Sequence, residues 1–190
     1  ANIKRTNLKN IINNLDEYLK NLSLEIKYYL NDEKLVERMA QLTQKTNQFN
    51  LTTKRYSENE ISFFVKDQKF FVIAIGLIDK FGDNGIVGLA IIKQEKQIAE
   101  IDTLLMSCRI LGRKIEFKFM DIIINFLKRK DIKCVFAQYE ETSKNKQVKD
   151  LYGFFGFKKV SCGDVSIRYK LYVDEYVPSK IDFINVSLQN

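Results

Sequence analysis

The sequence predicts a single α+β domain, because two kinds of apolar pattern follow one another along the chain. Some segments place apolar residues at helical spacing, whereas others are short runs of consecutive apolar residues that are typical of buried strands. A polar stretch, KFGDNG, separates two of these runs and predicts a hairpin turn. At 190 residues, with 45% hydrophobic and 12% aromatic residues, the chain is large and apolar enough to bury a core.

The expected elements are assigned by these two periodicities. In chain order they are helix 8–22, strand 24–30, helix 31–46, helix 57–64, strands 70–79, 86–93 and 99–107, helix 115–130, strand 133–139, helix 144–155, and strands 157–160 and 165–173. The last two strands are expected to pair with each other as antiparallel neighbours.

Polar residues set several of these bounds. Asn31 and Asp32 can cap the second helix, and Ser57 with Glu60 forms the pattern of a capping box for the third. The single proline, Pro178, marks the start of a C-terminal tail. We therefore divide the chain into a leading linker helix (1–22), a main domain (23–177) and a C-terminal tail (178–190).

The chain contains no histidine, and this excludes several classes of site. Ser-His-Asp catalysis, Cys-His catalysis and histidine metal sites are all ruled out, and we expect no bound metal. Cys108, Cys134 and Cys162 are odd in number and never form a CxxC pair, which is typical of the reducing cytoplasm. No apolar run is long enough to span a membrane and no signal peptide is evident, so we expect no membrane partner. Because the chain begins without Met, we expect it to be cut from a longer protein.

The formal net charge of +7 suits a polyanionic ligand or an acidic partner protein. A lysine-rich background without functional meaning would give the same charge. Nucleic acid is not the expected partner, because acidic residues are interspersed throughout and no motif of basic and aromatic residues occurs.

A basic turn, RILGRK, lies between the strand at 99–107 and the helix at 115–130. A helix N-terminus presents free N–H groups and about half a positive charge, which attract phosphate. Gly112 would let the backbone approach a ligand closely, while Arg109, Arg113 and Lys114 would add charge-assisted hydrogen bonds. The alternative is a solvated basic loop, which is how most runs of charge end up.

Two motifs resemble the GNAT (Gcn5-related N-acetyltransferase) fold. RILGRK resembles the family's Arg/Gln-x-x-Gly-x-Gly/Ala signature, with Lys114 where a small residue is usual. NKQVKDLYGFFGF resembles its second marker, a helix that ends in an aromatic-Tyr pair and is followed by Gly-Phe. The resemblance implies a mixed central sheet flanked by helices and acyltransferase activity. It also implies a cofactor, either acetyl-CoA or another acyl-CoA, or the phosphopantetheine of an acyl carrier protein.

The GNAT resemblance also implies which residues bind the cofactor. They lie on the strand before the basic turn, on the turn itself and at the start of the later helix: Leu104, Leu105, Met106, Arg109, Leu111, Gly112, Arg113, Lys114 and Asn145. The carrier's pantetheine arm would pair with the backbone of the strand in the manner of an added strand.

Tyr152 is the candidate catalytic acid. A phenol has an ordinary pKa of about 10, so it stays protonated at neutral pH and can protonate a leaving thiolate. The alternative is an aromatic residue at the buried end of a helix. No general base stands out among the carboxylates.

The polar loop TNQFNLTT is the candidate substrate loop. In the GNAT fold that the two motifs resemble, the segment between the first two helices lines the acceptor side. The resemblance therefore implies that Asn47, Gln48, Asn50 and Thr52 recognise a polar, hydroxylated acyl group. These side chains would otherwise only cap their own loop, because Asn and Thr readily bond to nearby backbone groups.

A closer resemblance covers residues 24–173. QLTQKTNQFNLTTKRYS, KFGDNGIVGLAII and IDTLLMSCRILGR are together similar to the C-terminal half of FkbH-like proteins, whose N-terminal half is a HAD-superfamily (subfamily IIIC) domain. This resemblance implies transfer or positioning of a small acyl or glyceryl group on an acyl carrier protein, for polyketide extender units such as methoxymalonyl. The HAD motif Asp-x-Asp-x-Thr does not occur, so the HAD half would be absent. The alternative is a non-catalytic module that docks the carrier protein for the HAD domain.

Overall fold

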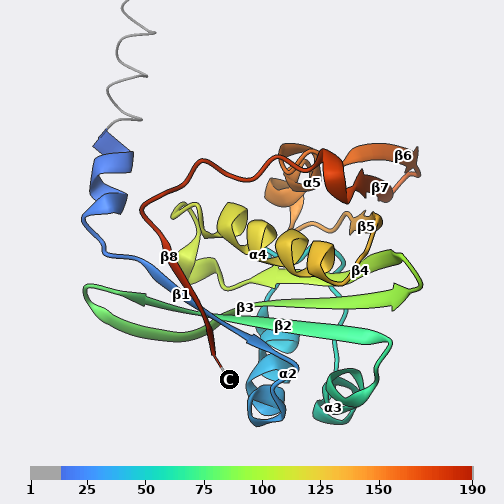
Figure 1. The fold of residues 1–190 in the computed structure, drawn as a ribbon, viewed down its shortest axis with the longest axis horizontal. Helices are drawn as coiled ribbons and strands as arrows, with labels where there is room; N and C mark the ends of the chain where they lie inside the picture. Colours follow the sequence, from blue (N-terminus) through green and yellow to red (C-terminus); the bar gives the residue numbers. More distant parts are fainter. Residues whose placement is uncertain (1–13, 190) are drawn as a thin grey trace, which may run out of the picture.

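An eight-stranded mixed sheet runs through the part of the chain that the computed structural model describes, residues 14–189 (Figure 1). The strands lie in the order β6-β7-β5-β4-β3-β2-β1-β8. They are β1 (Glu25–Leu30), β2 (Phe70–Asp79), β3 (Gly82–Glu95), β4 (Ile98–Met106), β5 (Cys134–Glu140), β6 (Lys158–Cys162), β7 (Ser166–Tyr172) and β8 (Asn185–Gln189). The pairs β4–β5 and β1–β8 are parallel, and the other neighbours are antiparallel.

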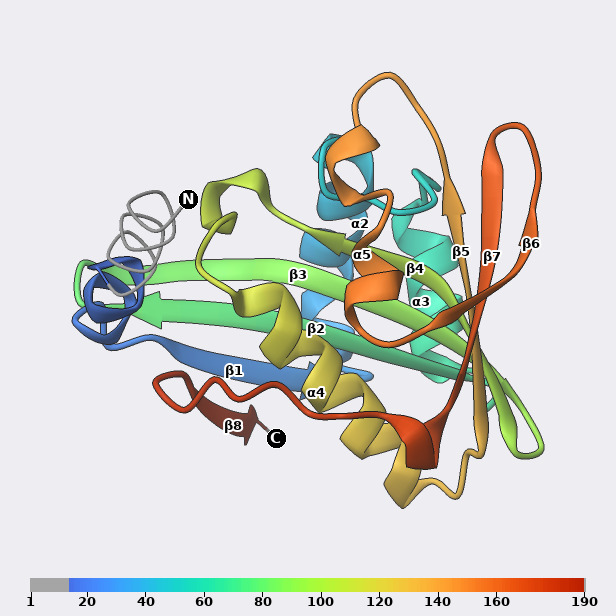
Figure 2. The ribbon, with the colours of Figure 1, turned by 90° about the horizontal axis from the view of Figure 1, so that it is seen from above.

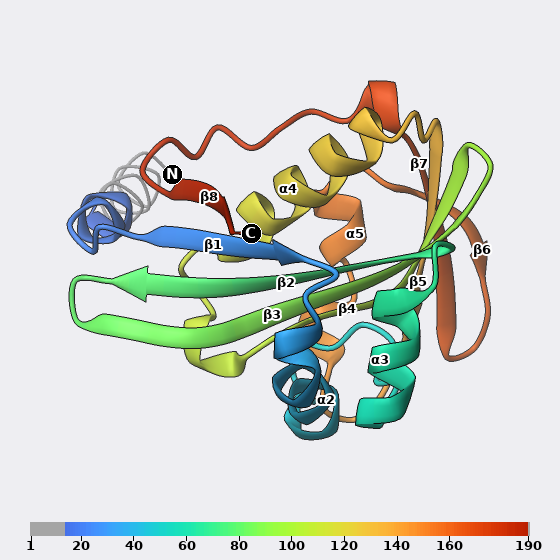
Figure 3. The ribbon, with the colours of Figure 1, turned by 60° about the horizontal axis from the view of Figure 1, so that its bottom comes forward.

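Helices cover both faces of this sheet, so the predicted α+β fold with a mixed sheet is confirmed. On one face lie α4 and α5, and on the other lie α2 and α3 (Figures 1 and 3). The helices are α2 (Val36–Lys45), α3 (Glu58–Lys66), α4 (Ile115–Arg129) and α5 (Leu151–Phe154), with 3₁₀ turns at Glu33–Leu35, Cys108–Ile110, Lys146–Val148 and Val173–Glu175. Of the predicted leading helix, 8–22, residues 14–20 are helical, residues 21 and 22 form a turn, and residues 8–13 lie outside the described residues.

Two apolar cores result from the alternation of side chains along the strands. On β4, Leu104 and Met106 pack in the core beneath α4, together with Phe119. Leu105 faces the opposite way and packs in the core beneath α2 and α3, together with Met39. β4 is therefore held between two apolar layers. No helix within residues 14–189 combines the length and apolar character needed to cross a bilayer.

The predicted caps are confirmed in part. Ser57 and Glu60 form a capping box at the start of α3, with the Ser57 hydroxyl accepting from the Glu60 N–H. Asp32 caps a 3₁₀ turn that precedes α2. Asn31 does not cap a helix, because its side-chain oxygen accepts a hydrogen bond of 2.7 Å from the N–H of Val72 on β2.

Two segments differ from the sequence prediction. The helix expected at 144–155 is a 3₁₀ turn followed by the four-residue α5. The interruption falls at Lys149, whose carbonyl accepts a hydrogen bond of 3.1 Å from the Tyr169 hydroxyl. The range 178–190, predicted to be a tail, contributes β8, which pairs with the free edge of β1 (Figure 2).

Candidate functional site

The sheet opens where β4 and β5 separate. The two strands pair from Ile98 with Cys134 to Ile101 with Ala137, although both continue beyond that point. On its other side β4 pairs Ile101 with Ile92 and Thr103 with Ile91, which leaves Asp102 as an extra residue. Such a β-bulge bends its strand and is common beside active sites. The bulge at Asp102 therefore accompanies a gap between the C-terminal halves of β4 and β5.

The chain's own residues 49–51 fill this gap. The N–H of Met106 donates to the Phe49 carbonyl at 2.9 Å, and the N–H of Leu51 donates to the Leu104 carbonyl at 3.2 Å. On the other side, the N–H of Glu140 donates to the Leu51 carbonyl at 2.8 Å. A pantetheine arm that paired with this stretch of β4 would have to displace residues 49–51, because they already use its backbone groups.

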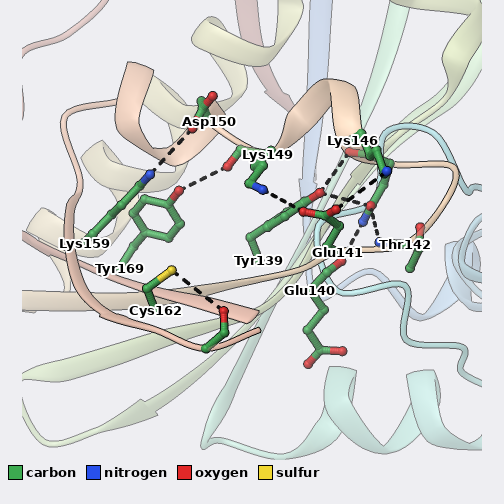
Figure 4. Close-up of polar contacts among 12 residues, drawn as sticks. Tyr139, Glu140, Glu141, Thr142, Lys146, Lys149, Asp150, Lys159, Cys162 and Tyr169 are labelled. Carbon is green, nitrogen blue, oxygen red and sulfur yellow. Dashed lines mark hydrogen bonds and ion pairs between the residues drawn. The ribbon is translucent and has the colours of Figure 1, made fainter. Parts of the chain in front are cut away.

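Asn145 holds this segment against β5. Its side-chain nitrogen donates to the carbonyls of Asn50 at 2.9 Å and Glu140 at 2.8 Å. Its side-chain oxygen accepts from the N–H of Thr142 at 2.8 Å and from the Tyr139 hydroxyl at 3.2 Å. Figure 4 shows the cluster of polar contacts around Tyr139, Glu140 and Thr142. Both N–H groups of the Asn145 side chain are therefore used within the protein. None of them remains to donate to a cofactor, the role that we expected for this side chain.

The four expected substrate residues separate into two pairs. Asn50 is fully buried, donates to the Thr46 carbonyl and accepts from the Thr53 N–H at 2.8 Å. Thr52 is also buried and donates to the Asp102 carbonyl at 3.1 Å. These two side chains cap their own loop and join it to the bulge, as the structural alternative predicted.

Asn47 and Gln48, by contrast, face a cavity of about 890 Å³ at the C-terminal ends of β4 and β5. It is lined by Arg38, Gln41, Leu42, Lys45, Thr46, Asn47, Gln48, Ser107, Cys108, Arg109, Ser143 and Lys144. The residues come from α2, from the loop after it, and from the segments that follow β4 and β5. Sequence reasoning missed the α2 side chains, although Arg38, Gln41 and Lys45 recur on one helical face.

The basic turn has the backbone expected of an anion site. Gly112 is exposed, has a φ of +79°, and has no atom within 4 Å of the position that a Cβ would take. Within the described residues, the N–H groups of Gly112, Arg113 and Lys114 have no hydrogen-bond acceptor. They precede α4, a 15-residue helix whose N-terminus attracts negative charge. The phosphate end of the expected cofactor therefore fits this turn.

Two of the three cations in this turn are already paired. Arg113 contacts Asp79 at 2.6 Å, and Lys114 contacts Asp16 at 2.6 Å. Burial raises the pKa of Asp79, but hydrogen bonds from Arg113, Phe81 and Asn84 outweigh this and hold the pKa below its ordinary value. Lys114 has a left-handed φ of +61° and directs its amine to residues 14–20, so it does not close the turn. Arg109 alone has no acidic partner among the described residues.

Tyr152 is buried at 1% exposure, and its ring packs against Phe157 and Tyr169. Its hydroxyl has no hydrogen-bond partner within the described residues. Burial raises its pKa, and the charges of Asp102 and Tyr169 raise it further. The phenol is therefore protonated at neutral pH. A buried hydroxyl without a partner is rare, since it costs about 1–3 kcal/mol, and it indicates a donor that a ligand could satisfy.

Asp102 is the carboxylate whose charge acts on Tyr152, and it accepts hydrogen bonds from the side chains of Lys54 and Tyr56. Glu116, at the start of α4, also has a buried oxygen without a partner, and burial raises its pKa. Within residues 14–189 no three acidic or thiol side chains gather into a group that could hold a metal ion.

No protein-family model matches this chain, and no curated protein matches its sequence. Among solved structures, the ribosomal-protein-S18-alanine N-acetyltransferase from Escherichia coli superposes with a TM-score of 0.61 at 11% identity, covering 82% of this chain and 97% of its own. The Salmonella typhimurium protein yncA, solved with its cofactor acetyl-CoA, superposes with a TM-score of 0.56 at 14% identity, covering 82% of this chain and 99% of its own. The Vibrio cholerae spermidine/spermine N-acetyltransferase SpeG, in mutant form, gives a TM-score of 0.59 at 10% identity over 80% of this chain and 95% of its own.

These similarities confirm the expected fold, which is that of the GNAT N-acetyltransferases. At such low identity they concern the fold alone. The similarity to FkbH-like proteins stays a prediction from the sequence.

Proposed function

We propose that this domain transfers a small acyl group from a thioester carrier, either an acyl-CoA or the phosphopantetheine arm of an acyl carrier protein. The observation that carries the proposal is the junction of β4, β5, α4 and α5, in a fold shared with acetyltransferases. There the bulge at Asp102, a helix N-terminus with free N–H groups and a buried tyrosine hydroxyl without a partner belong to adjoining elements. The bound carrier would supply the acyl group in activated form, as a thioester.

The turn before α4 would bind the phosphates of the carrier. The N–H groups of Gly112, Arg113 and Lys114 would donate to phosphate oxygens. The Arg109 side chain, expected from the sequence to bind the carrier, instead lines the cavity between α2 and the ends of β4 and β5. Arg113 and Lys114 would bind phosphate through their backbone N–H groups more than through their side chains, because the side chains are paired with Asp79 and Asp16.

Tyr152 would protonate the departing thiolate. Its pKa is raised by burial, so the phenol keeps its proton at neutral pH and can only donate. As the acceptor's nucleophile bonds to the acyl carbon, the carbon–sulfur bond breaks and the leaving sulfur takes the phenol proton. A thiol, with an ordinary pKa of about 8.5, is a stronger acid than this phenol, so the phenol would take up in exchange the proton that the acceptor loses.

The sequence resemblance refines this proposal. The group transferred would be a small acyl or glyceryl unit, the carrier an acyl carrier protein, and the setting the biosynthesis of polyketide extender units beside a HAD domain. The net charge of +7 supports an acidic protein partner.

One observation favours a second function, a non-catalytic module that docks the carrier protein. Residues 49–51 already bond to the backbone of Leu104 and Met106, so the edge of β4 is not free for a pantetheine arm. A docking module would need only the basic turn and surface, and its residues 49–51 would stay in place.

Binding and transfer measured on the same protein separate these functions. Acetyl-CoA at 100 times its dissociation constant is expected to add about 2.7 kcal/mol of stability, which raises the melting temperature by several degrees. Transfer is then measured with acetyl-CoA and with acyl-loaded carrier protein, for the wild type and for Tyr152→Phe. Binding without any transfer would support docking, and the absence of binding to every carrier would contradict both functions.

A further inference from the structure

Four cations line the cavity between α2 and the ends of β4 and β5. Arg38 and Lys45 come from α2, Arg109 follows β4, and Lys144 follows β5. None of them forms an ion pair with a residue of the described chain, and no acidic side chain lines the cavity.

This arrangement contrasts with the cations around the start of α4. Arg113, Lys114 and Lys118 each contact an aspartate, at 2.6, 2.6 and 3.7 Å. Their charge is compensated by the fold, whereas the charge of the cavity is not. A concave site lined by one sign of charge focuses the field and raises the local concentration of oppositely charged ligands.

Local hydrogen bonds orient the guanidinium of Arg38 but use only some of its N–H donors. Arg38 donates to the Gln41 side chain at 3.4 Å and to the Ile86 carbonyl at 3.3 Å. A guanidinium has five N–H donors, so most of them remain for a ligand. Around the cations lie neutral polar side chains, Thr46, Asn47, Gln48, Ser107 and Ser143.

From this geometry we infer that the cavity binds a small polyanion, a molecule with two or more phosphate or carboxylate groups, which is the acyl acceptor. The volume of about 890 Å³ accommodates a metabolite-sized molecule. The cavity lies at the ends of β4 and β5, and its residues 46–48 lead directly into residues 49–51 in the gap. The acceptor role rests on the proposed acyl transfer, whereas the binding of a polyanion does not.

The test is calorimetric titration of the full chain with pyrophosphate, citrate and glycerol. We expect pyrophosphate or citrate to bind and glycerol not to bind, with affinity that falls as salt rises. Pyrophosphate alone would identify a phosphate acceptor, and citrate alone a carboxylate acceptor. No binding of either anion at millimolar concentration would overturn the inference.

A pair of double variants locates the site. Lys45→Ala/Lys144→Ala removes two exposed lysines of the cavity, and Lys66→Ala/Lys158→Ala removes two exposed lysines outside it. The cavity variant should bind the anion at least tenfold more weakly, while the control variant should bind it like the wild type. Equal weakening in both, or none in either, would place the anion elsewhere.

Titration in the presence of saturating acetyl-CoA separates the acceptor from the carrier. If the cavity holds the acceptor, pyrophosphate or citrate still binds with acetyl-CoA in place. If acetyl-CoA displaces the anion and itself binds the cavity variant tenfold more weakly, the cavity belongs to the carrier's phosphates and the inference is wrong. Anion binding by a protein that never binds a carrier would retain the polyanion site, while the acyl transfer and the acceptor role would both fail.

Discussion

The side chain of Asn145 donates a hydrogen bond of 2.9 Å to the backbone carbonyl of Asn50, which lies 95 residues earlier in the chain. The same nitrogen donates to the Glu140 carbonyl at the end of β5. One buried amide thus joins the segment in the gap to the strand beside it. This contact adds to the backbone hydrogen bonds that hold residues 49–51 between β4 and β5.

Replacing Asn145 with Ala should therefore destabilise the protein. The carbonyls of Asn50 and Glu140 would lose a donor inside the protein, at a cost of about 2–3 kcal/mol. The melting temperature should fall by roughly 5–10 °C. Gln48→Ala, at an exposed position in the same region, is the control and should change it little. Equal melting temperatures for the Asn145 variant and the wild type would show that the contact is not structural.

Replacing Tyr152 with Phe should lower acyl transfer without lowering stability. The hydroxyl has no partner among the described residues, so its removal breaks no hydrogen bond and removes a desolvated polar group. Transfer should fall by about 10²-fold or more, which is typical for loss of a general acid. Tyr169→Phe is the matched control, because it loses the bond to the Lys149 carbonyl and should lose about 1 kcal/mol of stability while keeping transfer. Unchanged transfer by the Tyr152 variant would refute its role as the acid.

Carrier binding should change the hydrogen exchange of the residues in the gap. In the free protein the N–H groups of Leu51, Met106 and Glu140 are hydrogen-bonded and should exchange slowly. If a pantetheine arm replaces residues 49–51 on β4, Leu51 and Glu140 should exchange faster with the carrier bound, while Met106 stays protected. Exchange should be compared with and without acetyl-CoA, with buried strand amides on β2 as an internal reference. Unaltered protection of all three amides would show that the carrier binds without opening the gap.

The ion pair of Asp79 with Arg113 should make stability depend on acid pH. Hydrogen bonding outweighs burial and lowers the pKa of Asp79 in the folded state, so the stabilisation is complete above the ordinary value of 3.8. It is lost as pH falls below that value towards the pKa in the folded protein. Asp79→Asn should be less stable than the wild type at neutral pH, and the two stabilities should converge in acid. Asp164→Asn, at an exposed site, should follow the wild type throughout, and parallel curves for the wild type and Asp79→Asn would contradict the assignment.

Local patterns in the sequence were enough to predict most of the fold. The strand at 70–79 has the predicted bounds, because its long apolar run is buried along nearly its whole length. The capping box of Ser57 and Glu60 formed as expected, since it involves groups three residues apart. β8 was not predicted, because its short polar-apolar alternation becomes a strand only against the edge of β1. The helix predicted at 144–155 was too long. It is interrupted at Lys149, whose carbonyl accepts a hydrogen bond from Tyr169 on β7, and local sequence patterns do not reveal a partner 20 residues away.

Residue types and their order along the chain sufficed for the α+β class, for most of the elements up to β7 and for the glycine turn before α4. Apolar periodicity and caps act between residues that are close in the chain, so they can be recognised without coordinates. The partners of the polar side chains followed from the folded sheet instead. Arg113 meets Asp79 across 34 residues and Lys114 meets Asp16 across 98, while the cavity cations come from three separate segments. Hydrogen bonds and ion pairs form over a few ångströms, so the assignment of each charge to a partner or to a ligand depended on the packing of distant strands and helices.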